Sequence, residues 1–453
     1  MAEWRKYWDE RVELAPREEI KRADEAKLRR QLQYVYERSP FYRRKFDQAG
    51  VKPESIRTVE DLAALPFTEK DELRRTQEEH PPLGEYQCAS LTDIIRIQAT
   101  SGTTGMPLFL GLTRHDADLW AEVGARTIWC MGFRPDDMMM ACGSYFIMVS
   151  GVSDHLAGER ASMAMVPIGV GRSAYLVRFA RFLGVNALGG TPSYMLYLPK
   201  VVREELGIEP YQLGIRKILV GGEPGGSIPA TRQEIEETWG ARVVDGLYGM
   251  ADVVSSFAGE CEVREGLHFC GQGAVIPELI NPESGENLPF EDDVVGEAVY
   301  TGIDREATPV VRYRSHDLMR VINRPCDCGR TSYRFEVLGR SDEMFIVKGV
   351  NIFCTAIEKL LGEMRPRLTG EFQVLLDRPS PLDIVRLRVE YGEGVAEEAL
   401  PELQGEVTAR LRKDLMCAAD VELCPPASLP RFEYKAKRMY RVYQGDVPDS
   451  PAG

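Results

Sequence analysis

From about residue 92 to residue 300, short apolar runs alternate with segments that have a helical pattern of apolar residues. The apolar runs have the length of strands, and several end in glycine: IIRIQAT, MMMACGSYF, AMVPIG, VNALGG, RKILVGG and RVVDGLYG. Intervening stretches such as HDADLWAEVGARTIW and TRQEIEETW have the pattern of helices. This alternation predicts an α/β fold with largely parallel strands. Ligands in such folds bind at the loops after the strand carboxyl ends, where several of these glycines lie.

The flanking regions have different patterns. Residues 18–48 predict an N-terminal helical region, and residues 294–322 predict strands of a smaller β element. Beyond VLGRSDEMFIVKGVN, the segments FQVLLD, VRLRVEYG and the helical pattern over 397–416 predict a compact α+β unit. We therefore expect a large N-terminal domain over residues 1–341 and a small C-terminal domain over 342–453, with the boundary near Asp342.

Charge and cysteine content exclude several classes of function. The formal net charge of −14 disfavours broad binding to nucleic acid or to an anionic membrane, but it permits a small anionic ligand. The N-terminal residues are charged, and no run approaches the roughly 18 apolar residues of a spanning helix. Ten cysteines without an export signal indicate reduced thiols or metal ligands, so we expect a cytoplasmic protein.

Residues 98–113, QATSGTTGMPLFLGLT, form a hydroxyl-rich loop between two apolar runs. Such a loop exposes backbone N–H groups and hydroxyl donors to one small volume, which suits an anion. It lacks the spacing of a Walker P-loop, and no lysine follows its second glycine. Taken alone, the loop fits either an anion site or an ordinary turn. The residues concerned are Ser101, Gly102, Thr103, Thr104 and Gly105.

Further motifs follow this loop in a fixed order: GGEP at 221–224, YGMAD at 248–252, YRSHDL at 313–318, GRSD at 339–342, KG at 348–349, and Lys435. Together they resemble the adenylate-forming superfamily of acyl- and aryl-CoA synthetases, and most closely its phenylacetate–CoA ligase branch. The resemblance is carried by TSGTTG, LYGMAD, VRYRSHDL and LGRSDEMFIVKGVNIF, and it extends over about residues 30 to 442. It implies a large adenylate-forming domain followed by a small mobile domain.

The resemblance implies that a carboxylic acid attacks the α-phosphate of ATP, giving acyl-AMP and pyrophosphate, and that coenzyme A then takes the acyl group. An anion attacks a polyanion in the first step, so electrostatic stabilisation must dominate. By resemblance, the 101–105 loop holds the β- and γ-phosphates, and Asp317 accepts hydrogen bonds from the ribose hydroxyls. Tyr248 lies against the adenine. The other implied nucleotide-site residues are Gly222, Glu223, Pro224, Asp245, Gly249, Met250, Ala251 and Arg340.

A catalytic lysine and a hinge are also implied by the resemblance. Lys435, in LPRFEYKAKR, lies where the family has its adenylation lysine, and Lys437 is the competing candidate. Such a lysine neutralises charge on the α-phosphate and orients the carboxylate. Asp342 is the expected hinge between the two half-reactions, and Lys348 and Gly349 are expected at the coenzyme A tunnel.

The sequence departs from the family pattern at two places. Met106 replaces the lysine that usually follows TSGTTG, so one phosphate contact is lost. Ala251 and Asp252 replace the usual Ser/Thr–Glu pair, so the expected Mg²⁺ ligand is the shorter carboxylate of Asp252, which binds closely or through water.

Two cysteine-containing clusters predict a structural metal site. GECEVREGLHFC supplies Cys261 and His268, and RPCDCGRT supplies Cys326 and Cys328. Three thiols and one imidazole match the ligand number and softness of structural Zn²⁺, and some members of the resembled branch carry a similar C-x-C-G-R-T element. Cys270 is an alternative ligand, and the competing interpretation is reduced cysteines beside a packed histidine.

The acyl pocket is expected to involve Tyr145, Phe146, Tyr194 and Gly246, and the resemblance favours a neutral aryl carboxylic acid of the phenylacetate, benzoate or hydroxyaryl type. Core packing is the competing interpretation for each of these aromatic residues. The leading prediction is thus an aryl-CoA ligase that uses ATP, Mg²⁺ and coenzyme A, and a homodimer is compatible with this branch. The alternatives are an enzyme that loads an aryl acid onto a carrier protein, and a catalytically weak nucleotide-binding regulator, which Met106 and Ala251 would favour.

Overall fold

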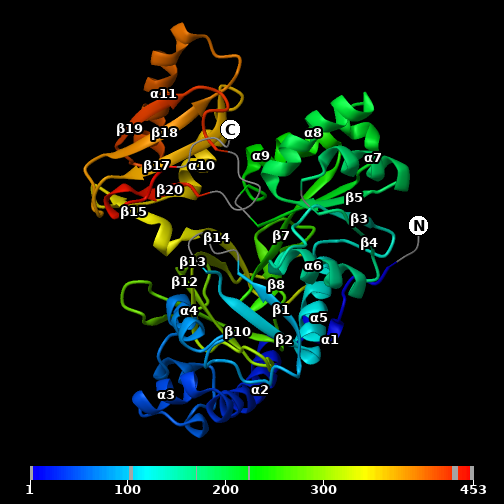
Figure 1. Cartoon of the computed structure of the whole chain (residues 1–453), viewed down its shortest axis with the longest axis vertical. Helices are drawn as coiled ribbons and strands as arrows, with labels where there is room; N and C mark the ends of the chain where they lie inside the picture. Colours follow the sequence, from blue (N-terminus) through cyan, green and yellow to red (C-terminus); the bar gives the residue numbers. More distant parts are fainter. Residues whose placement is uncertain (1–3, 101–105, 170, 223–224, 431–436, 449–453) are drawn as a thin grey trace. The chain divides into compact units, whose positions relative to one another are not determined.

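The computed structural model describes residues 4–100, 106–169, 171–222, 225–430 and 437–448 of the 453-residue chain. The chain forms two compact units, one made of residues 1–221 and 235–336 and the other of residues 222–234 and 337–453. The α/β class predicted from the sequence is confirmed (Figure 1).

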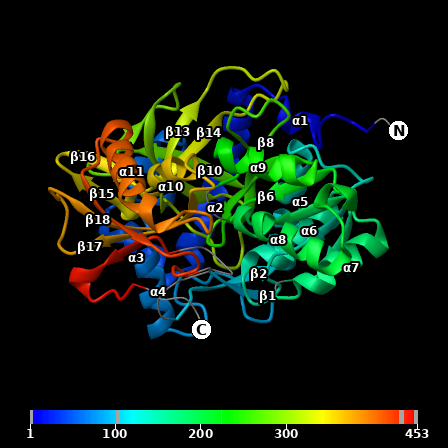
Figure 2. The ribbon, with the colours of Figure 1, turned by 90° about the horizontal axis from the view of Figure 1, so that it is seen from above.

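The first unit contains the parallel strands that the sequence predicted. They run in the order β4 (Ala164–Pro167), β3 (Met138–Ala141), β5 (Ala187–Gly190), β6 (Lys217–Val220) and β7 (Arg242–Met250). Four long helices precede or connect them: α5 (Arg114–Cys130), α6 (Val149–Arg160), α7 (Ser173–Leu183) and α8 (Pro192–Leu206), and α9 (Pro229–Trp239) leads to β7. Figures 1 and 2 show α5 beside α6 and α7 beside α8.

Alternate residues of these strands pack against helices on opposite faces of the parallel region. Met139 and Leu219 pack in one apolar cluster with residues of α5 and α6. Their neighbours Met140 and Ile218 pack in another cluster with residues of α7 and α8. Because successive strand residues point to opposite faces, the two helix pairs cover opposite faces of the sheet.

The same sheet continues beyond β7 and contains twelve strands within the described residues. The continuation runs in the order β8 (Val254–Glu260), β9 (Leu267–Phe269), β14 (Arg334–Arg340), β13 (Tyr313–Ile322), β12 (Val295–Gly302), β10 (Val275–Ile280) and β11 (Asn287–Leu288). The pairs β7–β8, β8–β9 and β12–β13 are antiparallel. The sequence predicted strands over residues 294–322, and the structure forms β12 and β13 there as part of the main sheet.

The N-terminal helices and one hairpin complete the first unit. The helices are α1 (Glu10–Glu13), α2 (Arg17–Arg38), α3 (Pro40–Gln48) and α4 (Lys70–Glu79). Ser39 ends α2 and caps α3, because its Oγ accepts a hydrogen bond of 3.1 Å from the Tyr42 N–H. Strands β1 (Ile94–Ala99) and β2 (Phe109–Thr113) form a separate two-stranded sheet and flank the hydroxyl-rich loop, and Ala99 of β1 also forms a bridge with Met148.

The second unit is the expected α+β element. Its four-stranded sheet has the order β19 (Ala419–Cys424), β18 (Val385–Tyr391), β17 (Leu368–Leu376) and β20 (Met439–Arg441). Residues of α10 (Cys354–Gly362) and α11 (Leu400–Asp414) share one apolar core with this sheet. The hairpin β15 (Met344–Val347) and β16 (Val350–Phe353) turns at Lys348 and Gly349, whose φ angles of 49° and 83° suit a two-residue turn.

Candidate functional site

The residues predicted for the acyl pocket lie along one edge of the parallel strands. Tyr145 and Phe146 follow the carboxyl end of β3, and Tyr194 lies in the first turn of α8, directly after β5. Gly246 lies in the middle of β7, directly after Asp245, the last residue of β7 that pairs with β6. Because β3, β5, β6 and β7 are parallel neighbours, these residues share the edge at which α/β folds bind ligands.

Hydrogen bonds fix the two tyrosine rings. The Tyr145 hydroxyl lies 3.1 Å from Nδ1 of His155, and the Tyr194 hydroxyl lies 2.8 Å from Oγ of Ser173. Burial raises the pKa of each phenol to about 12, so both remain protonated at neutral pH. Phe146, by contrast, is 72% exposed. With their hydroxyls engaged, the two tyrosines present ring surface.

Next to His155, helix α6 carries a partly buried acid, Asp154, that the sequence did not identify. The Oδ1 atom of Asp154 is shielded from solvent and has no hydrogen-bond partner within the described residues. Burial raises the pKa of this carboxyl from 3.8 to about 8. A carboxyl in such an environment is held as the neutral acid at physiological pH.

Changing Asp154 to asparagine is expected to stabilise the protein in a pH-dependent way. An acid whose pKa is raised by folding contributes stability that is present below its unfolded pKa and lost as the pH rises through its folded pKa. For Asp154 that window runs from 3.8 to about 8. We expect the melting temperature of Asp154→Asn to exceed that of the parent by roughly 5 °C at pH 8 and by much less at pH 5.

Thermal melts of both proteins between pH 5 and pH 9 measure this effect. Asp71→Asn is the control, because the Asp71 side chain is 82% exposed and forms only a surface ion pair with Arg74, so its replacement should give a small difference in melting temperature. A stability gain for Asp154→Asn that is equal at all pH values would contradict the buried-acid interpretation.

Tyr248 and Asp317, two of the residues predicted to bind the nucleotide, are in direct contact. The Tyr248 hydroxyl donates a hydrogen bond of 2.6 Å to Oδ2 of Asp317. The Tyr248 ring is held edge-on by Phe257 and Phe335, with centroid distances of 5.5 and 5.2 Å. Burial, together with the Asp317 charge, raises the pKa of Tyr248 well above its usual value, so the phenol remains the donor. The structure thus joins two motifs that lie 69 residues apart in the sequence.

The β7–β8 pairing is irregular around Tyr248, and the backbone at the next residue, Gly249, leaves no room for a side chain. A Cβ atom at Gly249 would lie 2.2 Å from the backbone oxygen of Ser255, so only glycine fits. The β7–β8 pairing shifts register on both sides of Tyr248. Asp245 and Met250 also lie in β7, and Ala251 follows it.

Asp252, the predicted Mg²⁺ ligand, is 7% exposed. Its Oδ2 accepts a hydrogen bond of 3.1 Å from the Tyr313 hydroxyl. One carboxylate oxygen therefore has a protein donor, which suits a water-mediated contact with a hydrated Mg²⁺ ion.

Several predicted residues lie in the second unit. Arg340 forms a two-point ion pair with Asp342, with distances of 2.9 Å to Oδ1 and 2.8 Å to Oδ2, and Arg441 donates to the Asp342 carbonyl. Lys348 is exposed at its turn. Lys437 lies 3.2 Å from Oδ1 of Asp446.

Other predicted residues are outside the described ranges: Ser101, Gly102, Thr103, Thr104, Gly105, Glu223, Pro224 and Lys435. Of their described neighbours, Met106 is 61% exposed, and Gly222 has a φ angle of 83°.

The four predicted metal ligands converge. The thiol sulfurs of Cys261, Cys326 and Cys328 and a ring nitrogen of His268 lie within 4.8 Å of one another. Sγ of Cys261 is 3.7 Å from Sγ of Cys326, and Sγ of Cys328 is 3.3 Å from Nε2 of His268. A tetrahedral Zn²⁺ with bonds of about 2.3 Å to sulfur needs sulfur atoms about 3.8 Å apart, so this donor set fits the metal.

Hydrogen bonds orient three of these four side chains, those of His268, Cys261 and Cys328. Nδ1 of His268 lies 3.2 Å from Oγ of Ser332, which leaves Nε2 facing the thiols. The backbone N–H groups of Val263 and Arg330 donate to Sγ of Cys261 and Cys328, at 3.4 and 3.5 Å. Cys270, the alternative ligand, lies outside the converging group, with its Sγ 3.5 Å from the carbonyl oxygen of His268.

The N-terminal segment packs against this cysteine loop. The Tyr7 hydroxyl donates a hydrogen bond of 2.8 Å to the Cys328 carbonyl, and a Cβ atom at Gly329 would lie 2.5 Å from the same hydroxyl. Glu13 and Arg330 form a buried ion pair of 2.7 Å. These contacts join the loop between β13 and β14 to the N-terminal segment. The contact of Cys328 with His268 joins the same loop to β9.

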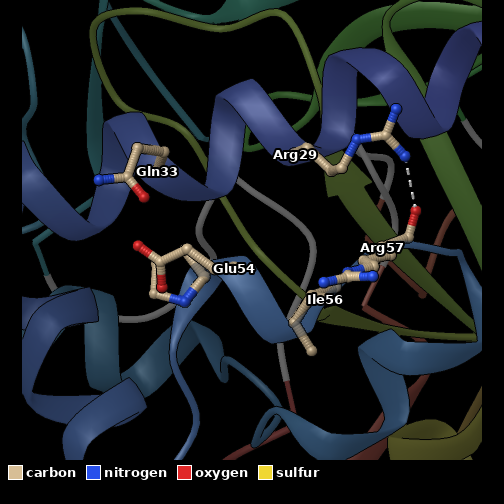
Figure 3. Close-up of a pocket in the computed structure, with 6 residues that line it drawn as sticks. Arg29, Gln33, Glu54, Ile56 and Arg57 are labelled. Atoms are coloured by element: carbon tan, nitrogen blue, oxygen red, sulfur yellow. Dashed lines mark hydrogen bonds between the residues drawn. The ribbon is translucent and has the colours of Figure 1, made fainter.

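The first unit also has a surface hollow away from the predicted site. None of the described site residues lines it. It measures about 430 Å³ and lies between α2 and the 3₁₀ segment Pro53–Ser55 (Figure 3). Arg29 closes one side by donating a hydrogen bond of 3.0 Å to the Arg57 carbonyl.

Comparison with known proteins identifies the family. A family model described as "AMP-binding enzyme" matches residues 25–303, and its C-terminal domain model matches residues 349–441. The chain belongs to the AMP-binding enzyme family. The phenylacetate-coenzyme A ligase of Thermus thermophilus is 32% identical over 440 residues, which are 93% of this chain and 96% of that protein. The Escherichia coli enzyme of the same name is 31% identical over 435 residues, 95% of this chain and 96% of that one.

A crystal structure of 2-hydroxyisobutyryl-CoA ligase in the postadenylation state, in complex with R3-HIB-AMP, matches with a TM-score of 0.88 at 32% identity. The match covers 97% of this chain and 94% of the other. This AMP-binding enzyme is therefore an AMP-forming acid–thiol ligase of the phenylacetate–CoA ligase-like branch, and its use of ATP and coenzyme A follows from the family. Among the described residues, no helix combines the length and apolar character needed to span a bilayer.

Proposed function

We propose that this ligase activates an aryl carboxylic acid through an acyl-AMP intermediate and transfers the aryl-acyl group to coenzyme A. The observation that carries the proposal is the pair of fixed tyrosines at the acyl edge. Tyr145 and Tyr194 have their hydroxyls engaged by His155 and Ser173, so ring surface is what they offer a substrate. A flat aromatic group gains more from such surface than a small hydroxy acid, whose hydroxyl needs a polar partner.

The nucleotide roles are proposed as follows. Asp317, oriented by Tyr248, accepts hydrogen bonds from the ribose hydroxyls, and Asp252 holds Mg²⁺ through water. Arg340 contacts the nucleotide after leaving Asp342, which serves as the hinge between domains 1–341 and 342–453. Lys348 and Gly349 line the path of coenzyme A. Each role combines the sequence motif with the local contacts.

We also propose that Cys261, His268, Cys326 and Cys328 bind a structural Zn²⁺. The sulfur–sulfur and sulfur–nitrogen distances support this assignment, as do the hydrogen bonds to His268 and to two of the thiols. When bound, the ion would cross-link two strand ends and a loop. With four protein ligands it would have no open position for chemistry.

Acid-dependent exchange between ATP and labelled pyrophosphate tests the substrate proposal. We expect phenylacetate, benzoates or hydroxybenzoates to support exchange with kcat/KM at least about tenfold above that of 2-hydroxyisobutyrate, because the ring surface is used only by aryl groups. Product analysis with coenzyme A then detects the aryl-CoA thioester.

Each other outcome has a definite meaning. Preference for 2-hydroxyisobutyrate would replace the aryl proposal with a short hydroxy acid, the kind of substrate named for the structural neighbour. Exchange without thioester formation would indicate a carrier-protein acceptor. Nucleotide binding without exchange for any acid would contradict catalysis and favour a regulator.

A further inference from the structure

The strand that carries Asp317 has an irregular stretch at that residue. In the pairing of β12 with β13, Glu297 lies opposite Leu318 and Val299 lies opposite Arg314. One residue of β12 therefore faces three residues of β13, Ser315, His316 and Asp317, and the strand bulges. Bulges beside active sites redirect a side chain away from the regular alternation of the strand.

Two hydrogen bonds hold the bulge at Ser315. Its Oγ donates a hydrogen bond of 2.7 Å to the Ala298 carbonyl and accepts one of 3.0 Å from the Asp317 N–H. The middle residue, His316, has a φ angle of 61°, in the left-handed region that a non-glycine residue rarely adopts. A histidine in that conformation must be held by its surroundings.

The His316 ring lies between two carboxylates from other elements. Its Nε2 is 3.0 Å from Oε2 of Glu69, and its Nδ1 is 3.6 Å from Oε1 of Glu297. Glu69 is the N-cap of α4, so its position is fixed by the helix start. Glu297 is fully buried and is itself held by Arg314, with two contacts of 2.8 Å.

The charged groups around Glu69 favour its ionised form. The hydrogen bond from His316 holds the pKa of Glu69 below its usual range, and the charges of His316, Arg314 and Lys45 act in the same direction. Glu69 is thus an ionised partner for the imidazole. Glu69 at the start of α4 and Glu297 of β12 contact the bulge at His316. Tyr248 contacts the bulge at Asp317.

We propose that His316 is a positioning residue: its ring, held by Glu69 and Glu297, fixes the bulge so that the Asp317 carboxylate stays aimed at the ribose hydroxyls of the nucleotide. This inference rests on the proposed ribose role of Asp317. Loss of the ring frees the backbone at residue 316, so the carboxylate spends less time in the binding orientation. The effect falls on nucleotide affinity, and the acid and coenzyme A are bound by other residues.

His316→Gly tests the proposal, because glycine adopts the left-handed conformation without strain and removes the ring together with Cβ. Glu69→Gln leaves residue 316 unchanged, so it tests the ring's contact without the added backbone freedom of glycine. We expect the KM for ATP to rise about tenfold, with kcat and the KM values for acid and coenzyme A changed less than about threefold. Glu69→Gln retains an N-cap acceptor but loses the charge, and it should raise the KM for ATP in the same direction. Free imidazole should partly restore the KM of His316→Gly by filling the vacated space.

The matched control is His115→Gly. Its Nε2 forms a similar 3.0 Å contact with Oδ1 of Asp304 in the same unit, outside the proposed nucleotide site, so its KM for ATP should not change. Asp317→Asn separates the two levels of the proposal. If it leaves the KM for ATP unaltered, the ribose role itself is wrong. If it raises that KM while His316→Gly and Glu69→Gln do not, the positioning role of His316 is overturned and the ribose role stands.

Discussion

Replacing Lys435 with alanine is expected to slow acyl-AMP formation about 100- to 1000-fold, which is the usual loss when one charged group that stabilises a transition state is removed. Negative charge accumulates on the α-phosphate as the carboxylate attacks it. By resemblance to the family, Met106 stands where a lysine usually follows TSGTTG. Lys435 would then supply a larger share of the compensating charge. ATP–pyrophosphate exchange measures this half-reaction directly.

The second half-reaction provides the internal check on this prediction. Thioester formation from supplied acyl-AMP and coenzyme A should remain within about threefold of the parent, because the thiolate attacks the acyl carbonyl and not the α-phosphate in that step. Lys437→Ala is the matched control: Lys437 is already paired with Asp446 at 3.2 Å, so we expect its loss to change exchange by less than about threefold. An equal collapse of both half-reactions in Lys435→Ala, or a larger effect of Lys437→Ala, would reassign the catalytic lysine.

The sequence predicted the parallel region of the fold because each strand there is a short apolar run followed by glycine. The runs RKILVGG and RVVDGLYG became β6 and β7, as neighbours in one sheet. The extent of the antiparallel region was not predicted, because strands such as β10 and β12 take their place from pairing partners and not from local pattern. IIRIQAT is a strand as predicted, but it pairs with β2 outside the main sheet.

For the candidate site, the sequence located motifs but not their contacts. Tyr248 and Asp317 were singled out separately, and only the fold shows the hydrogen bond between them. Glu69 was not singled out at all, because its contact with His316 spans 247 residues. Asp154 was also not predicted, because its raised pKa comes from the packing around α6, and the sequence near Asp154 does not indicate that packing.

The four candidate metal ligands were easier to locate in the sequence, because they come as two local pairs with the chemistry of one ion. Cys261 and His268 flank the turn between β8 and β9, and Cys326 and Cys328 lie in one short loop. What the sequence left open was whether the pairs meet and whether Cys270 takes part. The convergence of four donor atoms within 4.8 Å answers the first question, and it leaves Cys270 outside.

We expect the purified enzyme to contain about one Zn²⁺ per chain, and the double variant Cys326→Ser/Cys328→Ser to lose it. The loss should lower the melting temperature by roughly 10 °C, because the ion's binding free energy to the folded state is lost with its ligands. The destabilisation should be concentrated near the cysteine loop, where Tyr7 and the Glu13–Arg330 ion pair join the N-terminal segment to it. Metal analysis, thermal melts and hydrogen exchange of residues 4–17 measure the three effects.

The double variant Cys417→Ser/Cys424→Ser is the matched control for this experiment. Both thiols are buried in the second unit, so the control carries the cost of replacing two buried cysteines without touching the cluster. It should retain zinc and normal protection of residues 4–17. Because four protein ligands leave no open coordination position, the metal-free variant should still catalyse pyrophosphate exchange at a temperature at which it remains folded. A metal-free parent protein would show that the four side chains pack without an ion, and loss of exchange from a folded variant would place the metal in the chemistry.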